Sequence, residues 1–488
     1  MSWKAEHKHV IALYVIQILT VGWGIYWLII AAYYSVPNVE DFSLAIRPRD
    51  QGLIPSVINL LVSYDSRYTD AFLHGLNPLA FNWVEWFIVM PILCFIFFVV
   101  SLYYFLSAFI TDKGIRFQLL GYALLFVVIH YAMETQLPCG LYLMVSTFNY
   151  IYPWFFAFIW SGALLRTIHE TSVTKKILLS ILGYFALILS YGCTEFFISI
   201  NGFALIALFL YTAVYDQSKL KYVIPYCLVA ISCVVFIFLC PSQKIINDKP
   251  FYDLAERYPN SNFIIESTKI YIRFTWECLL HPLSICFVLV TTFFFSRIDM
   301  PGNMKFRVSQ RQLLWLFIGC IIVSYVTSWI FFIPIGSTGI FPRYTFNSLL
   351  ILAELGFFVF LPLYLKQPLA MFATNYSFRF AHPLAATLLL LLLLHTDNNI
   401  TLVEQEYDAG IIQDVKYKAQ QFYSRVQLAK LQTPEHTVVY FENPAITPQT
   451  NYFGPDMLPN RGAPHWNIAY EDYFHIDEVR MPGDTLFK

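Results

Sequence analysis

Residues 84–110 read VEWFIVMPILCFIFFVVSLYYFLSAFI and contain a single charged side chain, Glu85. A run of this length and polarity crosses the hydrocarbon core of a bilayer as one helix, because about 20 apolar residues suffice. Applied along the chain, the same criterion predicts about eleven transmembrane segments, at 9–34, 84–110, 117–133, 148–165, 177–193, 196–215, 222–240, 275–296, 312–334, 346–365 and 380–395. The predicted fold is therefore an all-α polytopic membrane protein.

The composition of the whole chain supports this prediction. Of the 488 residues, 58% are hydrophobic and only 13% are charged, which is more apolar surface than a soluble core can bury. The net charge of -1 and the lack of Lys/Arg-rich tracts argue against a nucleic-acid partner. The nine cysteines have no metal-ligand spacing, so no metal site and no cofactor are predicted.

Basic residues lie in alternate short loops, which the positive-inside rule places in the cytoplasm. These residues are Lys113, Arg116, Arg166, Lys175, Lys176, Lys219, Lys221, Arg297, Lys305, Arg307 and Arg311. The N-terminus is then cytoplasmic, and the loops 35–83 and 241–274 are outside. We predict a membrane domain at 1–395 and an extracytoplasmic C-terminal domain at 396–488, with helices in the first outer loop lying along the membrane surface.

Two adjacent acids, Glu40 and Asp41, follow the first transmembrane segment where water meets the bilayer. A carboxylate at that place, partly desolvated by aromatic neighbours, is a candidate general base for an acceptor hydroxyl. The structural alternative is that both acids belong to the capped first turn of a surface helix beginning near Phe42. The sequence ranks Asp41 before Glu40 as the base.

Further candidates for substrate or phosphate binding lie in the outer segments. Arg273 and Arg343 are cations on a face that normally has few of them, and an arginine there suits a phosphate. The alternative for both is contact with lipid headgroups. The other candidates are Asp65, Arg67, Glu195 and Tyr150. Asp65 and Arg67 could instead pair with each other, and Glu195 could instead lie at the membrane interface without a functional role. An aromatic belt at the membrane surface would also explain Tyr150.

His130 and Glu134 are four residues apart and share one helix face. No third ligand stands at a suitable spacing for a metal. The spacing therefore predicts a buried ion pair between these two side chains.

The layout of an acidic motif, surface helices, many membrane segments and an outer C-terminal domain resembles the GT-C superfamily of membrane glycosyltransferases. Within it, the chain is similar to bacterial enzymes that use a polyprenyl-phosphate sugar, including serotype-converting O-antigen glucosyltransferases. Residues 146–153 (STFNYIYP) resemble a Gly/Asn-Tyr-x-x-Pro pattern of these enzymes. Residues 463–467 (APHWN), followed by Tyr470 and by Tyr473 with Phe474, resemble a late His-Trp-Asn and Tyr-Phe pattern.

The resemblance implies transfer of a sugar, with inversion, from a polyprenyl-phosphate donor to a glycan acceptor such as the O-antigen of lipopolysaccharide. The base would be Asp41 or Glu40, and Arg343, with Arg273, would stabilise the leaving phosphate. The implied location is the inner membrane of a bacterium, and membrane lipids surround the chain. Members that use monophosphate donors generally need no metal.

Two other functions remain open. A ligase or polymerase acting on a pyrophosphate-linked glycan would be expected to have a His and several Arg in one outer loop, and 241–274 contains no His. A transporter or flippase would be expected to have charged residues in mid-membrane on several helices.

Overall fold

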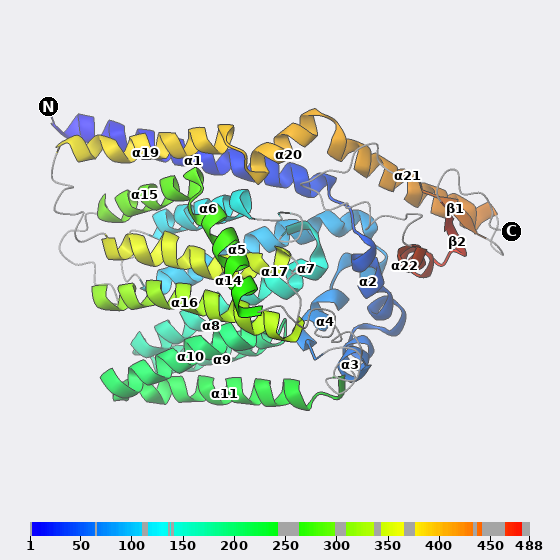
Figure 1. Cartoon of the computed structure of the whole chain (residues 1–488), viewed down its shortest axis with the longest axis horizontal. Coiled ribbons are helices and arrows are strands. Elements are labelled where there is room, and N and C mark those ends of the chain that lie inside the picture. Colours follow the sequence, from blue (N-terminus) through cyan, green and yellow to red (C-terminus); the bar gives the residue numbers. More distant parts are fainter. Residues whose placement is uncertain are drawn as a thin grey trace.

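The chain was analysed as a computed structural model, which describes residues 2–63, 66–109, 116–134, 137, 141–242, 263–297, 309–335, 343–365, 376–432, 437–441 and 464–480. Some helical residues in these ranges are described by their backbone alone, among them 2–14, 343–347 and 464–466. The described part consists almost entirely of helices, and most of them lie side by side in one elongated bundle (Figure 1). The prediction of a mainly helical protein is confirmed.

Fourteen described elements make up the bundle. They are α1 (Ser2–Tyr34), α5 (Val89–Phe109), α6 (Arg116–Met133), α7 (Met144–Tyr150), α8 (Tyr152–His169), α9 (Val173–Tyr191), α10 (Phe196–Tyr215), α11 (Leu220–Leu239), α14 (Phe263–Leu279), α15 (Pro282–Arg297), α16 (Gln310–Ile335), α17 (Arg343–Glu354) with the π-helix η7 (Leu355–Phe360), and α19 (Tyr376–His395). The 3-10 helices η2 (Val84–Ile88) and η5 (Gln217–Lys219) precede α5 and α11.

Each of the predicted transmembrane segments coincides with helical structure. Eight helices in the described part are long and apolar enough to cross a membrane, and the number rises to ten if each of two bent pairs is one span. One pair is α14 with α15, bent by 61°, and the other is α19 with α20 (Asn399–Asp408), bent by 43°. The predicted segment 117–133 matches the shorter apolar helix Gln118–Met133.

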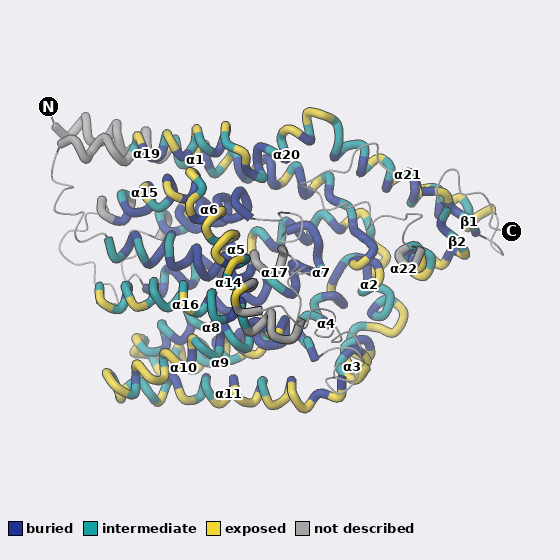
Figure 2. Tube along the Cα trace, viewed as in Figure 1, coloured by how far each residue is buried: buried dark blue, intermediate teal, exposed yellow. Residues whose placement is uncertain are grey.

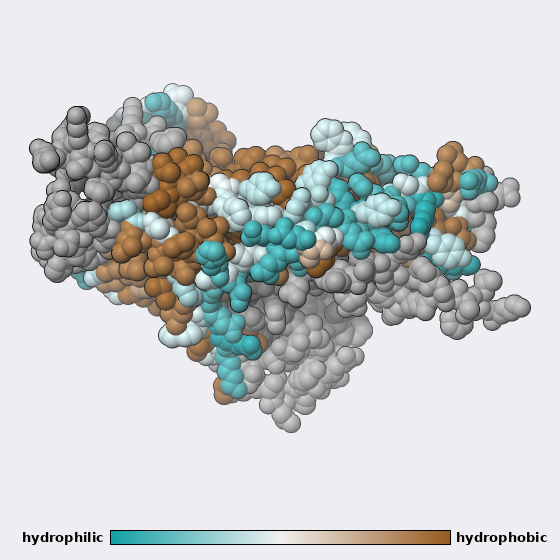
Figure 3. Space-filling model, turned by 90° about the horizontal axis from the view of Figure 1, so that it is seen from above, coloured by the Kyte–Doolittle hydropathy of each residue, from teal (hydrophilic) through white to brown (hydrophobic). Residues whose placement is uncertain are grey.

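The outer surface of the bundle is apolar, as expected of a surface in contact with lipid. On α9, for example, Ile177, Leu178, Ile181 and Phe185 are all exposed. Figure 2 shows exposed residues along α11 and buried ones on the central helices. On the face in Figure 3, apolar side chains gather over the bundle, and hydrophilic ones gather towards the end that carries the C-terminal segment.

The segment 35–83, which the sequence predicts to be the first outer loop, and the C-terminal segment lie at the same end of the bundle, opposite to the N-terminus (Figure 1). The loop folds into α2 (Val39–Gln51), α3 (Leu53–Ser63), α4 (Tyr68–Gly75) and the 3-10 helix η1 (Pro78–Phe81). In the C-terminal segment, α20 still packs on α1 and α6, with Ile400 and Val403 fully buried. It is followed by α21 (Ile411–Gln432), α22 (Pro464–Phe474) and a two-stranded parallel sheet, β1 (Val438–Tyr440) with β2 (Glu478–Arg480).

Candidate active site

Glu40 and Asp41 both lie in the first turn of helix α2, but in different environments. Asn38 is the N-cap, and its side chain accepts a hydrogen bond from the Asp41 backbone N–H (3.0 Å). In return, Asp41 Oδ2 accepts one from the Asn38 backbone N–H (3.2 Å), which completes a capping box. Asp41 therefore belongs to a helix cap, which was the structural alternative to a catalytic role. The helix begins at Val39, whereas the sequence predicted a start near Phe42.

Asp41 also joins α2 to a second helix. Its Oδ1 accepts hydrogen bonds from the backbone N–H groups of Met144 (3.1 Å) and Val145 (3.4 Å), in the first turn of α7. The side chain is fully buried. Burial raises the pKa of Asp41 to about 7, against the opposing effects of the Asn38 and Val145 N–H groups and of the nearby His74. Asp41 is thus placed to hold two helix N-termini together.

Glu40, by contrast, is exposed. Partial desolvation by the surrounding protein raises the pKa of its carboxyl, and the electrostatic effect of His74 opposes this. A solvent-accessible carboxylate of raised pKa is well suited to accept a proton from a bound hydroxyl. Of the two adjacent acids, only Glu40 can be reached by a substrate in this conformation.

Asp70 and His74 complete this group of ionisable side chains. They are one turn apart on α4, with His74 Nε2 3.1 Å from Asp70 Oδ1, and the His74 ring stacks edge-on against Phe148 of α7 at 5.0 Å. Helix α4 packs on both α2 and α7, so the structure brings the helices that carry these side chains to one site. Sequence reasoning missed both residues as site candidates, although an Asp-x-x-x-His spacing on a helix signals such a pair.

Arg67 and Glu195, predicted separately, pair with each other. Arg67 Nη2 lies 2.9 Å from Glu195 Oε2, and their side chains are 30% and 45% exposed. The neighbouring Gly192 carbonyl accepts hydrogen bonds from the backbone N–H groups of Thr69 (2.9 Å) and Asp70 (3.3 Å), and a Cβ at Gly192 would collide with Tyr68. The break between α9 and α10 therefore serves as the docking point for α4.

A double-mutant cycle measures the contribution of this ion pair. We expect the coupling free energy between Arg67→Met and Glu195→Gln to be about 0.5–1 kcal/mol, because both side chains are partly exposed to water and salt. Denaturant unfolding in detergent measures it, and the coupling should decrease at high ionic strength. A coupling of several kcal/mol that does not respond to salt would contradict this and indicate a buried functional pair.

The remaining predicted residues either have other contacts or lie outside the described residues. Tyr150 ends α7 and its ring contacts Phe196 at 6.0 Å. Arg273 is 73% exposed and pairs with Glu277 of its own helix at 2.9 Å. Arg343 begins α17, but its side chain lies outside the described residues, as does all of Asp65.

The C-terminal helix α22 packs directly on α2. Phe42, next to Asp41, is fully buried, and its ring lies 4.6 Å from Tyr473, 5.2 Å from Tyr470 and 5.3 Å from Phe474. Tyr473 donates a hydrogen bond to the Leu79 carbonyl (2.8 Å). The resulting contact, which we call the α2–α22 clamp, brings part of the late Tyr-Phe motif to the acidic first turn.

Arg49 strengthens the α2–α22 clamp from the other end of α2. Its guanidinium donates to the backbone carbonyls of Tyr473 and Asp472 and lies over the Tyr473 ring, 4.9 Å from the ring centroid. Its side chain is only 6% exposed. A buried arginine bonded in this way fixes the angle between the two helices.

Among the described residues, no group of three or more His, Cys, Asp or Glu side chains is arranged to hold a metal ion. The described groups of the site are the carboxylates of Glu40, Asp41 and Asp70, the imidazole of His74 and the N-termini of α2 and α7. No protein-family model, no curated protein and no solved structure matches this chain.

Proposed function

We propose that the chain is a membrane glycosyltransferase that moves a sugar, a hexose such as glucose, from a polyprenyl-phosphate donor to a glycan acceptor. The observation that carries this proposal is the exposed Glu40, held by the buried Asp41 at the end of a bundle of apolar helices. A lipid-borne donor and a water-borne acceptor meet at such a boundary. The resemblance to the GT-C superfamily supports the same function.

In the proposed reaction, Glu40 takes the proton of the acceptor hydroxyl as its oxygen attacks the anomeric carbon. The bond between that carbon and the phosphate oxygen breaks, and polyprenyl phosphate leaves with the electron pair. A single displacement of this kind inverts the configuration of the sugar. Asp41 takes the role of a positioning residue, which reverses the order in which the sequence ranked the two acids.

The leaving phosphate needs a cation. Arg67 and Arg273 each already pair with a carboxylate, and the neighbouring carboxylate would repel a phosphate. Arg343, at the outer start of α17, is therefore our first candidate. The proposal further takes the end of the bundle with α2, α4 and α22 as extracytoplasmic, the N-terminus as cytoplasmic, and the membrane as a bacterial inner membrane with O-antigen or another surface polysaccharide as acceptor.

Reconstitution tests this function directly. In proteoliposomes supplied with a synthetic polyprenyl-phosphate hexose and an acceptor glycan, we expect one polyprenyl phosphate released for each sugar transferred. Chelation of divalent metals should leave the rate unchanged. Transfer only from a pyrophosphate-linked glycan would instead identify a ligase or polymerase, and movement of the lipid donor across the bilayer without transfer would identify a transporter.

A further inference from the structure

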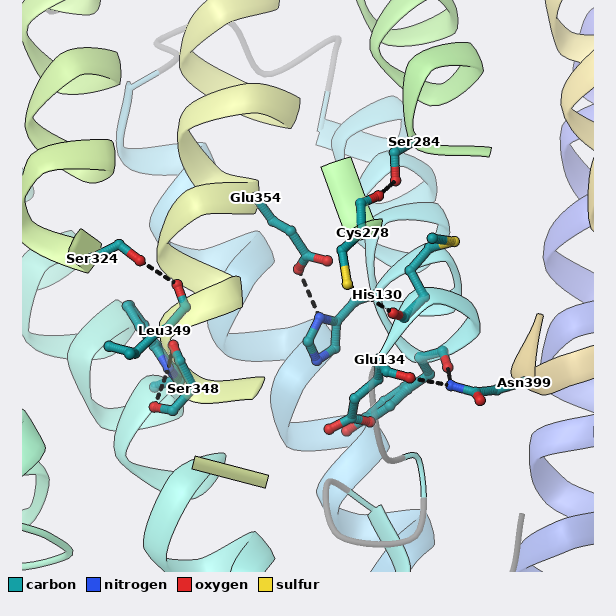
Figure 4. A network of polar contacts seen from close by, with 12 residues as sticks. His130, Glu134, Cys278, Ser284, Ser324, Ser348, Leu349, Glu354 and Asn399 are labelled. Carbon is teal, nitrogen blue, oxygen red and sulfur yellow. Dashed lines mark hydrogen bonds and ion pairs between the residues drawn. The ribbon is translucent and has the colours of Figure 1, made fainter. Parts of the chain in front are cut away.

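Charged side chains within the bundle generally have partners inside the protein. The Nδ1 atom of His130 on α6 is 2.7 Å from Oε2 of Glu354, the last residue of α17, and both side chains are buried (Figure 4). The partner predicted from the sequence, Glu134, was therefore wrong for this nitrogen. The sequence spacing could not reveal Glu354, which is 224 residues away.

Arg166, near the end of α8, is paired in a similar way. Its guanidinium donates to the Tyr104 carbonyl (2.6 Å) and to the Ser107 hydroxyl (2.7 Å), and it lies over the Tyr104 ring, 3.8 Å from the ring centroid. Acceptors on the neighbouring helix α5 therefore hold this cation.

Two lysines at the same end of the bundle are arranged differently. Lys176 and Lys221 lie in the first turns of α9 and α11, at the end opposite to α2, which the positive-inside rule predicts to be cytoplasmic (Figure 1). Lys176 Nζ donates to the Tyr222 hydroxyl (3.2 Å). The Nζ atoms of Lys176 and Lys221 both lie over the Tyr222 ring, 5.4 Å and 5.2 Å from its centroid. Two ammonium groups from two helices thus meet on one phenol.

No described carboxylate forms an ion pair with either of these two lysines. Two acids lie nearby. Asp216 pairs with Lys219 at 2.8 Å. Glu170 follows α8, and its Oε1 accepts hydrogen bonds from the backbone N–H groups of Thr171 (2.9 Å) and Ser172 (3.1 Å). The two ammonium groups on the phenol therefore form a local excess of positive charge.

Close packing of α9 against α11 brings the two lysines together. A Cβ at Gly183 of α9 would collide with the Tyr226 hydroxyl of α11, and the rings of Tyr184 and Tyr226 are 4.7 Å apart. Tyr226 lies one turn after Tyr222, so this contact places Tyr222 beside α9. The position of the phenol between the lysines is therefore set by the fold.

A phosphate fits this arrangement. Its oxygens can accept hydrogen bonds from both ammonium groups. The Tyr222 hydroxyl accepts from Lys176 and keeps its own hydrogen for a third bond to the anion. The dipoles of α9 and α11 also favour an anion at these helix starts. An anion that contacts both lysines would relieve the repulsion between them.

The surface beside the lysines is apolar. Ile177 and Ile181 on α9 and Ile224 and Leu228 on α11 are exposed, and both helices are apolar enough to cross a membrane. The phosphate would therefore lie where lipid headgroups meet acyl chains. A zwitterionic headgroup would bring its own ammonium into this positive field, whereas an anionic phospholipid brings none. Charge complementarity therefore favours the anionic phospholipid.

We propose that Lys176, Lys221 and Tyr222 bind the phosphate of an anionic phospholipid, such as phosphatidylglycerol, in the leaflet at this end of the bundle. The acyl chains lie along the exposed apolar side chains of α9 and α11. This inference does not depend on the glycosyltransferase reaction.

Native mass spectrometry of the full chain in detergent tests the proposal by measuring the affinity for the first bound phosphatidylglycerol. We compare the wild type with Lys176→Met, Lys221→Met and the double variant, because methionine keeps an unbranched side chain without its charge. Each substitution should weaken binding about fivefold, and the double variant about 25-fold, because each basic residue at a membrane surface attracts anionic lipid to a similar extent. Phosphatidylethanolamine should bind more weakly and equally to all four proteins.

Two controls separate the site from general surface charge and from misfolding. Lys175→Met removes an exposed lysine one residue earlier on α9 and should change the affinity by less than about twofold, since solvent screens its charge. Lys176→Arg/Lys221→Arg keeps both charges and should retain binding. Wild-type affinity in the double methionine variant, or an equal loss in Lys175→Met, would overturn the proposal. Displacement of the lipid by glycerol phosphate at comparable concentration would identify a water-borne phosphate as the ligand and overturn the lipid assignment.

Discussion

Replacement of Glu40 by glutamine should reduce sugar transfer by roughly a hundredfold or more, the usual contribution of a positioned general base. Glutamine keeps the length and most of the polarity of the side chain but cannot accept a proton at neutral pH. Glu40 is exposed, so the substitution should leave membrane insertion and thermal stability unchanged. The measurement is kcat in proteoliposomes, normalised to folded protein.

Glu85→Gln is the matched control, because Glu85 is another exposed acid, in the 3-10 helix η2 just before α5. It should transfer sugar at the wild-type rate. For the wild type, activity should fall at low pH with a midpoint above the ordinary value for glutamate, since the pKa of Glu40 is raised. Full activity of Glu40→Gln would remove Glu40 from the reaction.

For Asp41→Asn we expect the reverse pattern, a loss of stability with little change in turnover per folded molecule. The amide keeps an oxygen for Met144 and Val145 but presents N–H to the Asn38 backbone N–H, leaving a buried donor unpaired. Such a group costs about 1–3 kcal/mol. Unfolding in detergent gives the stability, and kcat of the surviving folded fraction gives the turnover. A hundredfold loss of kcat in well-folded protein would restore Asp41 as the base.

The pH dependence of Asp41→Asn provides an independent check. Because the pKa of Asp41 rises from 3.8 to about 7 on folding, the folded state binds a proton that the unfolded state has lost. Wild-type stability should therefore fall as pH rises towards 7, while the Asn variant lacks this decline. The stability gap between the two proteins should narrow between pH 5 and pH 8. A gap independent of pH would show that Asp41 is already ionised in the folded protein at pH 5.

Patterns within short stretches of sequence predicted the features that depend on interactions between neighbouring residues. Apolar length located the helices, and the Asn38-x-x-Asp41 spacing is itself a recognisable capping signature that could have separated the two acids. The interaction partners of the polar side chains could not be predicted from such local patterns. Nothing near Arg67 indicates that it pairs with Glu195, 128 residues later, because periodicity shows which face is buried but not what covers it. The strands β1 and β2 are only three residues each, too short to give a readable alternation.

The α2–α22 clamp also has a consequence for how the protein is made. Tyr473 and Leu79 are 394 residues apart, and at about 5–20 residues per second a ribosome needs about 20–80 s to travel between them. During that interval α2 has left the ribosome, but α22, the helix that packs on it, has not yet been synthesised. A chain cut short before Pro464 would still contain every membrane-spanning helix described here and both acids, yet it could not assemble the surroundings of Phe42. Completion of the site is thereby tied to the synthesis of α22.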